Sequence, residues 1–253
     1  MSRSAAHAFR FLAAPAAALG IAWLAGATAA HEPEGHAPEP AASAAPPAAS
    51  DARFEPPAPG SYALPPFGRV GQHALLAPDG ARAPLLELGP GEVAFVSFVY
   101  LSCPDACPLA TAVLQRLDQA LSERPELAAR VALVTVSFDP ARDTPEAMAR
   151  HAAALAPRGR WRFLTAASPA ELAPLLADFG QDAAPLFGPA GVDTGLLAHV
   201  LKVFLVDGRG RIRNAYSTGF LDVRVLWNDA LTVLAEDPPD LAGARLGEKT
   251  PGD

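Results

Sequence analysis

Continuous apolar runs alternate along this chain with segments in which apolar residues recur every three or four positions. Val93 to Tyr100 and Val131 to Phe138 are almost continuously apolar, as in central strands that are covered on both faces. Between them, Pro108 to about Ser122 carries its large apolar residues on one helical stripe. The pattern therefore predicts two buried strands joined by a helix.

Other predicted elements begin or end at recognisable turn and capping residues. Thr144 and Ser168 are each followed by a proline and a first-turn glutamate, which predicts two helix starts, and these helices reach about Leu155 and Phe179. Turn signals and apolar runs predict the remaining elements. These are an early β-hairpin (Gln72 to Leu76 and Arg82 to Leu86), a short strand (Trp161 to Leu164), a second hairpin (Val200 to Val206 and Arg211 to Tyr216) and a closing helix (Leu221 to Leu234).

This order of elements indicates an α/β fold class with a mixed central sheet. It matches a thioredoxin-like fold with an N-terminal β-hairpin and an inserted hairpin near the C-terminus. Sites in α/β sheets usually lie at the carboxyl ends of the strands. We therefore expect the chemistry in the segment that follows Tyr100.

The N-terminal part of the chain lacks the globular pattern. Residues 1–30 combine two arginines, an apolar run and the small-residue stretch Ala27-Thr28-Ala29, which predicts a signal peptide. The run is short for a membrane span, so cleavage is favoured over retention as an anchor. Residues 31–62 are rich in proline and alanine and predict a disordered tether. His31 and His36 can bind a metal weakly there, although a solvated linker is the simpler interpretation.

We expect one folded domain over residues 63–236 and a polar tail over residues 237–253. Half of the 253 residues are hydrophobic, which is enough for a core. The net charge of −7 and the lack of a dense basic run argue against nucleic-acid binding. Arg209, Arg211 and Arg213 are expected on a solvated hairpin edge.

The chain has two cysteines, in the stretch Ser-Cys-Pro-Asp-Ala-Cys-Pro at the predicted strand-to-helix junction. Proline after Cys103 and after Cys107 disfavours helical geometry at both, and Pro108 suits the first helical position. Cys107 is therefore expected at the helix cap, with a lowered pKa. The pair can form a Cys103–Cys107 disulfide or bind a soft metal ion, and the spacing does not choose between these.

A disulfide across so short a loop would stabilise the fold little, so we favour a chemical role for the pair. Two ligands rarely complete a metal site, so a third is expected elsewhere. His151 is expected on an exposed helix face. His199 precedes an apolar strand, and its position alone favours a structural role. Asp139 and Asp143 can place negative charge near a metal, although turn formation and capping is the simpler interpretation.

Three stretches, FVYLSCPDACP, VTVSFDPARDTPEAM and HVLKVFLVDGRGRI, follow one another within about Ala63 to Leu234. Their motifs and order resemble the Sco/SenC family of copper chaperones for cytochrome c oxidase assembly. The resemblance implies a thioredoxin-like, exported and often tethered domain. It also implies a copper site formed by Cys103, Cys107 and His199, with Asp139 as a candidate to orient the imidazole. The chain differs at Ala198, Val200 and Gly208, where the family usually has an acidic residue, a hydroxyl residue and a proline.

The function implied by the resemblance is that of a periplasmic chaperone, released or anchored in the inner membrane. It would bind Cu(I) or Cu(II), receive it from another periplasmic donor, and deliver it to the dinuclear copper centre of the oxidase subunit. The alternative is a thiol-disulfide oxidoreductase that reduces the cysteines of that subunit. In that case Cys103 and Cys107 are the catalytic pair and His199 is dispensable.

Overall fold

The structure is a computed structural model, and it describes residues 54–104, 106–217 and 221–236. The expected signal peptide, residues 31–53 of the expected tether and the polar tail lie outside these ranges. Within them, no helix combines the length and the apolar character needed to cross a membrane.

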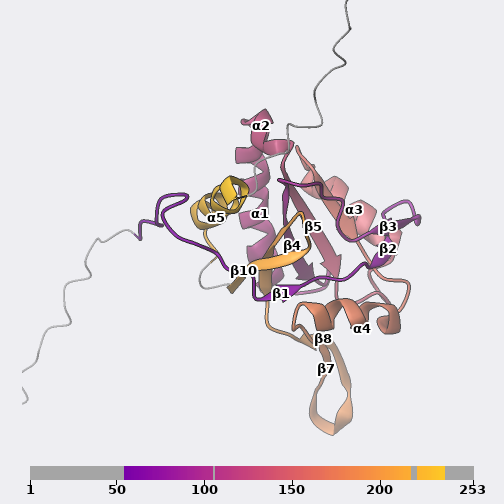
Figure 1. Ribbon diagram of the computed structural model, residues 1–253. Helices are drawn as coiled ribbons and strands as arrows, with labels where there is room; N and C mark the ends of the chain where they lie inside the picture. Colours follow the sequence, from indigo (N-terminus) through magenta and orange to yellow (C-terminus); the bar gives the residue numbers. More distant parts are fainter. Residues whose placement is uncertain (1–53, 105, 218–220, 237–253) are drawn as a thin grey trace, which may run out of the picture. The chain divides into compact units, whose positions relative to one another are not determined.

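A six-stranded mixed sheet forms the centre of the fold (Figure 1), with strand order β1-β10-β9-β4-β5-β6. In that order the strands are Gly68–Arg69, Arg211–Ser217, Lys202–Asp207, Val93–Val99, Val131–Ser137 and Trp161–Leu164. Strands β4, β5 and β6 are parallel, whereas β9 runs antiparallel to β4, and β10 to β9. Every residue of β4 and β5 is buried, as their continuous apolar runs predicted.

Helices cover the sheet on both sides, with α1 and α5 on one side and α3 on the other (Figure 1). The helices are α1 (Ala106–Ser122), α2 (Pro125–Ala128), α3 (Pro145–Leu155), α4 (Pro169–Asp178) and α5 (Val223–Glu236). The predicted caps are confirmed, because the Thr144 side chain accepts a hydrogen bond from the Ala147 amide and the Ser168 side chain accepts one from the Glu171 amide. The single turn of α2 was not predicted. This layered arrangement confirms the thioredoxin-like fold class.

Two hairpins lie outside the main sheet. The predicted early hairpin is confirmed as β2 (Ala74–Leu76) and β3 (Arg82–Pro84). The other hairpin was not predicted from the sequence; it is formed by β7 (Ala184–Phe187) and β8 (Asp193–Ala198). Figure 1 shows it extending away from the sheet, and all four residues of β7 are exposed. Strand β8 ends directly before His199.

Aromatic rings pack beneath the carboxyl end of β4. Phe98 contacts Phe138, Phe179 and Phe204 with ring centroids 5.5, 5.1 and 6.1 Å away. The rings come from β4, the end of β5, the end of α4 and β9. Tilted and edge-on aromatic pairs of this kind stabilise a core beyond the area they bury. They form a rigid base for the loops above them.

The turn between β9 and β10 is built around the buried carboxylate of Asp207. It binds Arg211 at 2.8 Å and Arg213 at 3.2 Å, and Arg213 also pairs with Glu236. The expectation that Arg213 lies on a solvated edge is wrong, since only 4% of it is exposed. Its charge is tolerated because two carboxylates neutralise it.

The next residue, Gly208, has no room for a side chain. A Cβ atom there would lie 2.1 Å from the carbonyl oxygen of Gly89. Glycine at this position is therefore required by the close approach of a neighbouring loop.

Replacing Asp207 with Asn should lower the free energy of unfolding at pH 7 by about 3 kcal/mol, because it removes a charge that neutralises buried Arg213. Burial alone raises the pKa of Asp207, but hydrogen bonds from Arg211, the Arg209 amide and Arg213 outweigh it and lower the pKa. The stabilisation is thus complete above the carboxyl's ordinary pKa, near 4, and is lost as the pH falls through the lowered value.

Urea unfolding at pH 7 and at about pH 3 measures this difference, which should shrink at the lower pH. Glu87→Gln is the matched control, because Glu87 pairs with Arg162 at the surface with 55% of its side chain exposed. The control should cost at most about 1 kcal/mol. Equal losses for the two variants would contradict the account.

Candidate metal centre

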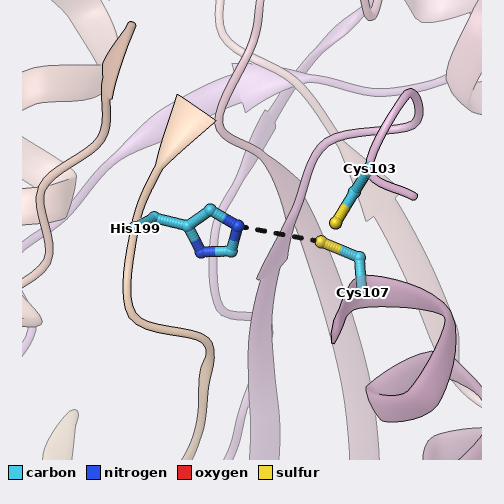
Figure 2. Close-up of side chains that lie close together, drawn as sticks. All are labelled: Cys103, Cys107 and His199. Atoms are coloured by element: carbon cyan, nitrogen blue, oxygen red, sulfur yellow. Dashed lines mark hydrogen bonds between the residues drawn. The ribbon is translucent and has the colours of Figure 1, made fainter. Parts of the chain in front are cut away.

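The structure brings Cys103, Cys107 and His199 together at one end of the sheet. One ligand atom from each of these residues lies within 4.8 Å of the others, which is close enough to hold a metal ion. Figure 2 shows the imidazole facing the two sulfurs, with Nε2 of His199 4.0 Å from Sγ of Cys107. Both cysteines are present as thiols.

The loop that carries Cys103 is fastened to the end of β5 through a buried carboxylate. Asp143 accepts the backbone amide of Leu101 at 3.0 Å and the hydroxyl of Ser137 at 2.5 Å. The Cys103 amide donates to the Tyr100 carbonyl at 3.0 Å. Asp143 therefore holds the cysteine loop in place. Turn formation and capping were the roles favoured for it from the sequence, and this role was not predicted. Burial raises its pKa, although the hydrogen bonds from Ser137 and Leu101 oppose this.

Cys107 lies in the first turn of α1, which begins at Ala106, two residues earlier than expected. Only 4% of the residue is exposed. Burial, followed by the neighbouring Cys103, raises the pKa of the Cys107 thiol to about 12, and a hydrogen bond with the Tyr100 backbone offsets this only in part. The predicted low pKa is wrong. The free-energy cost of burying a thiolate exceeds the stabilisation that the N-terminus of α1 gives to it.

His199 is placed by two aromatic rings that sequence reasoning missed. Its ring centroid is 5.5 Å from that of Tyr100, edge-on, and 4.8 Å from that of Phe138, tilted. The Tyr100 hydroxyl also accepts the Leu197 amide at 3.5 Å, which ties the end of β8 to the end of β4. Tyr100 immediately follows β4, and Phe138 immediately follows β5. This position after a buried strand was the signal in the sequence that could have identified the two rings. Burial lowers the pKa of His199, so the imidazole is neutral at pH 7, as metal binding requires.

Asp139 forms no hydrogen bond with His199 within the described residues, where Nδ1 of His199 is buried without a partner. Its carboxylate pairs with Arg142. Arg142 in turn lies beside β8, since a Cβ on Gly195 would be 3.0 Å from its Nη1.

The other two histidines that the structure describes, His73 and His151, are not part of this group. His73 binds Asp178 at 2.6 Å, and His31 and His36 lie outside the described residues. His151 is half-buried on α3, so the expectation of an exposed face is wrong. Its ring packs edge-on against Phe163, 5.7 Å between centroids.

The grouped side chains form a donor set that suits copper. Two thiolates are soft ligands for Cu(I), and an added imidazole makes Cu(II) acceptable. Fold and site together define a thioredoxin-like protein with a sulfur-and-imidazole metal centre.

The chain belongs to the SCO1/SenC family, whose family model matches residues 87–229, more than half of its length. Among curated protein sequences, none matches this chain.

Solved structures share the fold. Yeast Sco1 with copper bound is 20% identical, covers 72% of this chain and 97% of its own, and superposes with a TM-score of 0.56. Apo Sco1 from Thermus thermophilus is 27% identical over 70% of this chain and 95% of its own, with a TM-score of 0.52. BsSco, described as a member of the Sco family of cytochrome c oxidase assembly proteins, is 24% identical over 68% and 97%, with a TM-score of 0.53.

Iodoacetamide at pH 7.5 should modify Cys103 at least about ten times faster than Cys107, because a thiol with a pKa of about 12 is on the order of 1 in 10⁴ to 10⁵ thiolate at this pH. The single-thiol variants Cys107→Ser and Cys103→Ser allow each rate to be followed by mass spectrometry. In urea the two rates should become similar. If Cys107 in the folded protein were modified as fast as Cys103 or faster, the raised pKa of Cys107 would be refuted.

Proposed function

We propose that this protein is an exported copper chaperone, which uses Cys103, Cys107 and His199 to carry copper to the dinuclear copper centre of cytochrome c oxidase. The observation that carries the proposal is the convergence of these three side chains from distant parts of the chain. Membership of the SCO1/SenC family supports it. So do the copper in yeast Sco1 and the description of BsSco as belonging to a family of oxidase assembly proteins.

Binding copper requires that both thiols lose their protons. His199 is already neutral, whereas Cys107 is a thiol at pH 7 and is deprotonated by the metal itself. Copper uptake therefore releases protons and weakens as the pH falls. A buried thiol also resists oxidation while no metal is bound, since the thiolate is the reactive form.

The proposal includes the domain organisation that the sequence indicates. Residues 1–30 direct export and are cleaved or retained as an inner-membrane anchor, and residues 31–62 form the tether. The tether gives the copper-binding domain, residues 63–236, reach above the periplasmic face of the membrane. Residues 237–253 form a polar tail. Copper would come from another periplasmic protein.

A thiol-disulfide oxidoreductase is the second candidate function, because two neighbouring thiols lie at the end of the first buried strand of a thioredoxin-like fold. Cys103 is the more exposed of the two, so it would attack the substrate disulfide and Cys107 would resolve the mixed disulfide. The high pKa of Cys107 excludes it as the attacking thiolate at neutral pH. The chaperone is favoured because dithiol exchange gives no role to His199.

Cys103→Ser and Cys107→Ser should each weaken Cu(I) binding more than about 100-fold, since losing a residue that only orients a ligand already costs about 10–100-fold. His199→Ala should weaken Cu(II) binding more than Cu(I) binding and leave dithiol exchange largely intact. Anaerobic competition with a chromophoric chelator measures Cu(I) affinity, and spin resonance reports Cu(II).

His73→Gln is the matched control, because His73 pairs with Asp178 outside the metal group and its loss should leave copper binding unchanged. Full copper stoichiometry and affinity in either serine variant would show that the site is misassigned. If His199→Ala bound Cu(II) with wild-type affinity, His199 would not be a ligand, and the oxidoreductase, which gives it no role, would be the better description.

A further inference from the structure

The two thiols border a cavity on a flank that His199 does not occupy. The cavity has a volume of about 250 Å³ and lies between α1 and α3, next to the loop after β4. Cys103 and Cys107 both line it, together with Thr111 and Gln115 of α1 and His151 of α3. His199 is not among the lining residues. Tyr100, whose ring packs against the imidazole, lines the cavity as well.

The side of the site that carries His199 is filled by aromatic rings. Tyr100 and Phe138 pack against the imidazole, and the Tyr100 hydroxyl holds the Leu197 amide. A group that approached a metal from this side would have to displace packed rings, which costs free energy. The cavity between α1 and α3 needs no such displacement.

The cavity wall is neutral, which limits what can enter. None of the described side chains that line it carries a formal charge: they are apolar or bear only a thiol, hydroxyl, amide or imidazole group, and burial lowers the pKa of His151. A carboxylate or ammonium group would lose its hydration there without an opposite charge to bind. A water molecule in the liquid takes up about 30 Å³, so the space holds several waters or one small neutral side chain.

From these observations we infer that the cavity is the port through which a copper-exchanging protein inserts one cysteine side chain to reach the metal. The inference rests on the proposed function, since it concerns copper held by Cys103, Cys107 and His199. A thiol is neutral when it enters, as the uncharged wall requires, and its sulfur matches the soft character of copper. The geometry thus assigns the partner's reacting group to one chemical class.

The exchange step conserves charge and electrons. The partner's thiol gives its proton to solvent as its sulfur bonds to Cu(I), and one of the two thiolates of the site leaves the metal and takes a proton from solvent. Copper remains Cu(I) throughout, so the step needs neither an oxidant nor a reductant.

The test is the rate at which Cu(I)-loaded protein gives copper to an excess of the uncharged thiol N-acetyl-L-cysteine amide under anaerobic conditions, followed by rapid desalting and copper analysis. Thr111→Phe fills the cavity and should slow the transfer about tenfold or more, because the entering thiol must displace a packed ring. The Cu(I) dissociation constant should stay within about threefold, since no ligand is altered. Ala112→Phe adds the same ring at the next, exposed position of α1 and should change neither quantity.

A second variant keeps the test decisive if Thr111→Phe does not fold, as judged by circular dichroism. Leu155→Phe narrows the cavity from α3, because Leu155 also lines it, and it should slow the transfer about threefold to tenfold. Wild-type transfer rates in the folded variants would overturn the port while leaving the chaperone proposal standing. A wild-type protein that binds no copper would overturn both.

Discussion

The antiparallel pairing of β9 with β4 is the constraint on which this site depends. The register places Val93 opposite Asp207 and Ser97 opposite Val203, so the start of β9 lies where β4 ends. A residue just before β9 and a residue just after β4 are thereby brought to the same rim, although 92 positions separate Cys107 from His199. Because both strands are fully or almost fully buried, a slip of this register would expose an entire apolar face. The register is therefore fixed, and it also fixes the positions of the residues at this rim of the sheet.

Burial then determines the chemistry of the groups that the sheet brings together. It keeps the Cys107 thiol protonated and the His199 imidazole neutral, so these two ligands carry no charge at pH 7 before metal binds. The buried carboxylate of Asp143 is used to fix the cysteine loop. Such a site holds its ligand geometry without a metal and leaves the charge change to the moment of binding.

Much of the fold could be predicted because its signals are local. The caps at Thr144 and Ser168, the turn at Asp207 and the buried strands were read from a few neighbouring residues each, and the cysteine junction followed from them. The hairpin formed by β7 and β8 was missed, because its short strands carry proline and glycine and show no alternation. The pKa of Cys107 and the burial of His151 depend on residues distant in sequence, which no local pattern reports.

The position of His199 directly after β8 couples copper to the folding of one small element. A two-stranded hairpin that leaves the main sheet is only marginally stable by itself, and β7 is exposed along its whole length. Whatever unfolds this hairpin withdraws the imidazole, and whatever binds the imidazole stabilises the hairpin, by thermodynamic linkage. The free energy of metal binding therefore depends on the free energy of folding of this hairpin, and a change in either one alters the other.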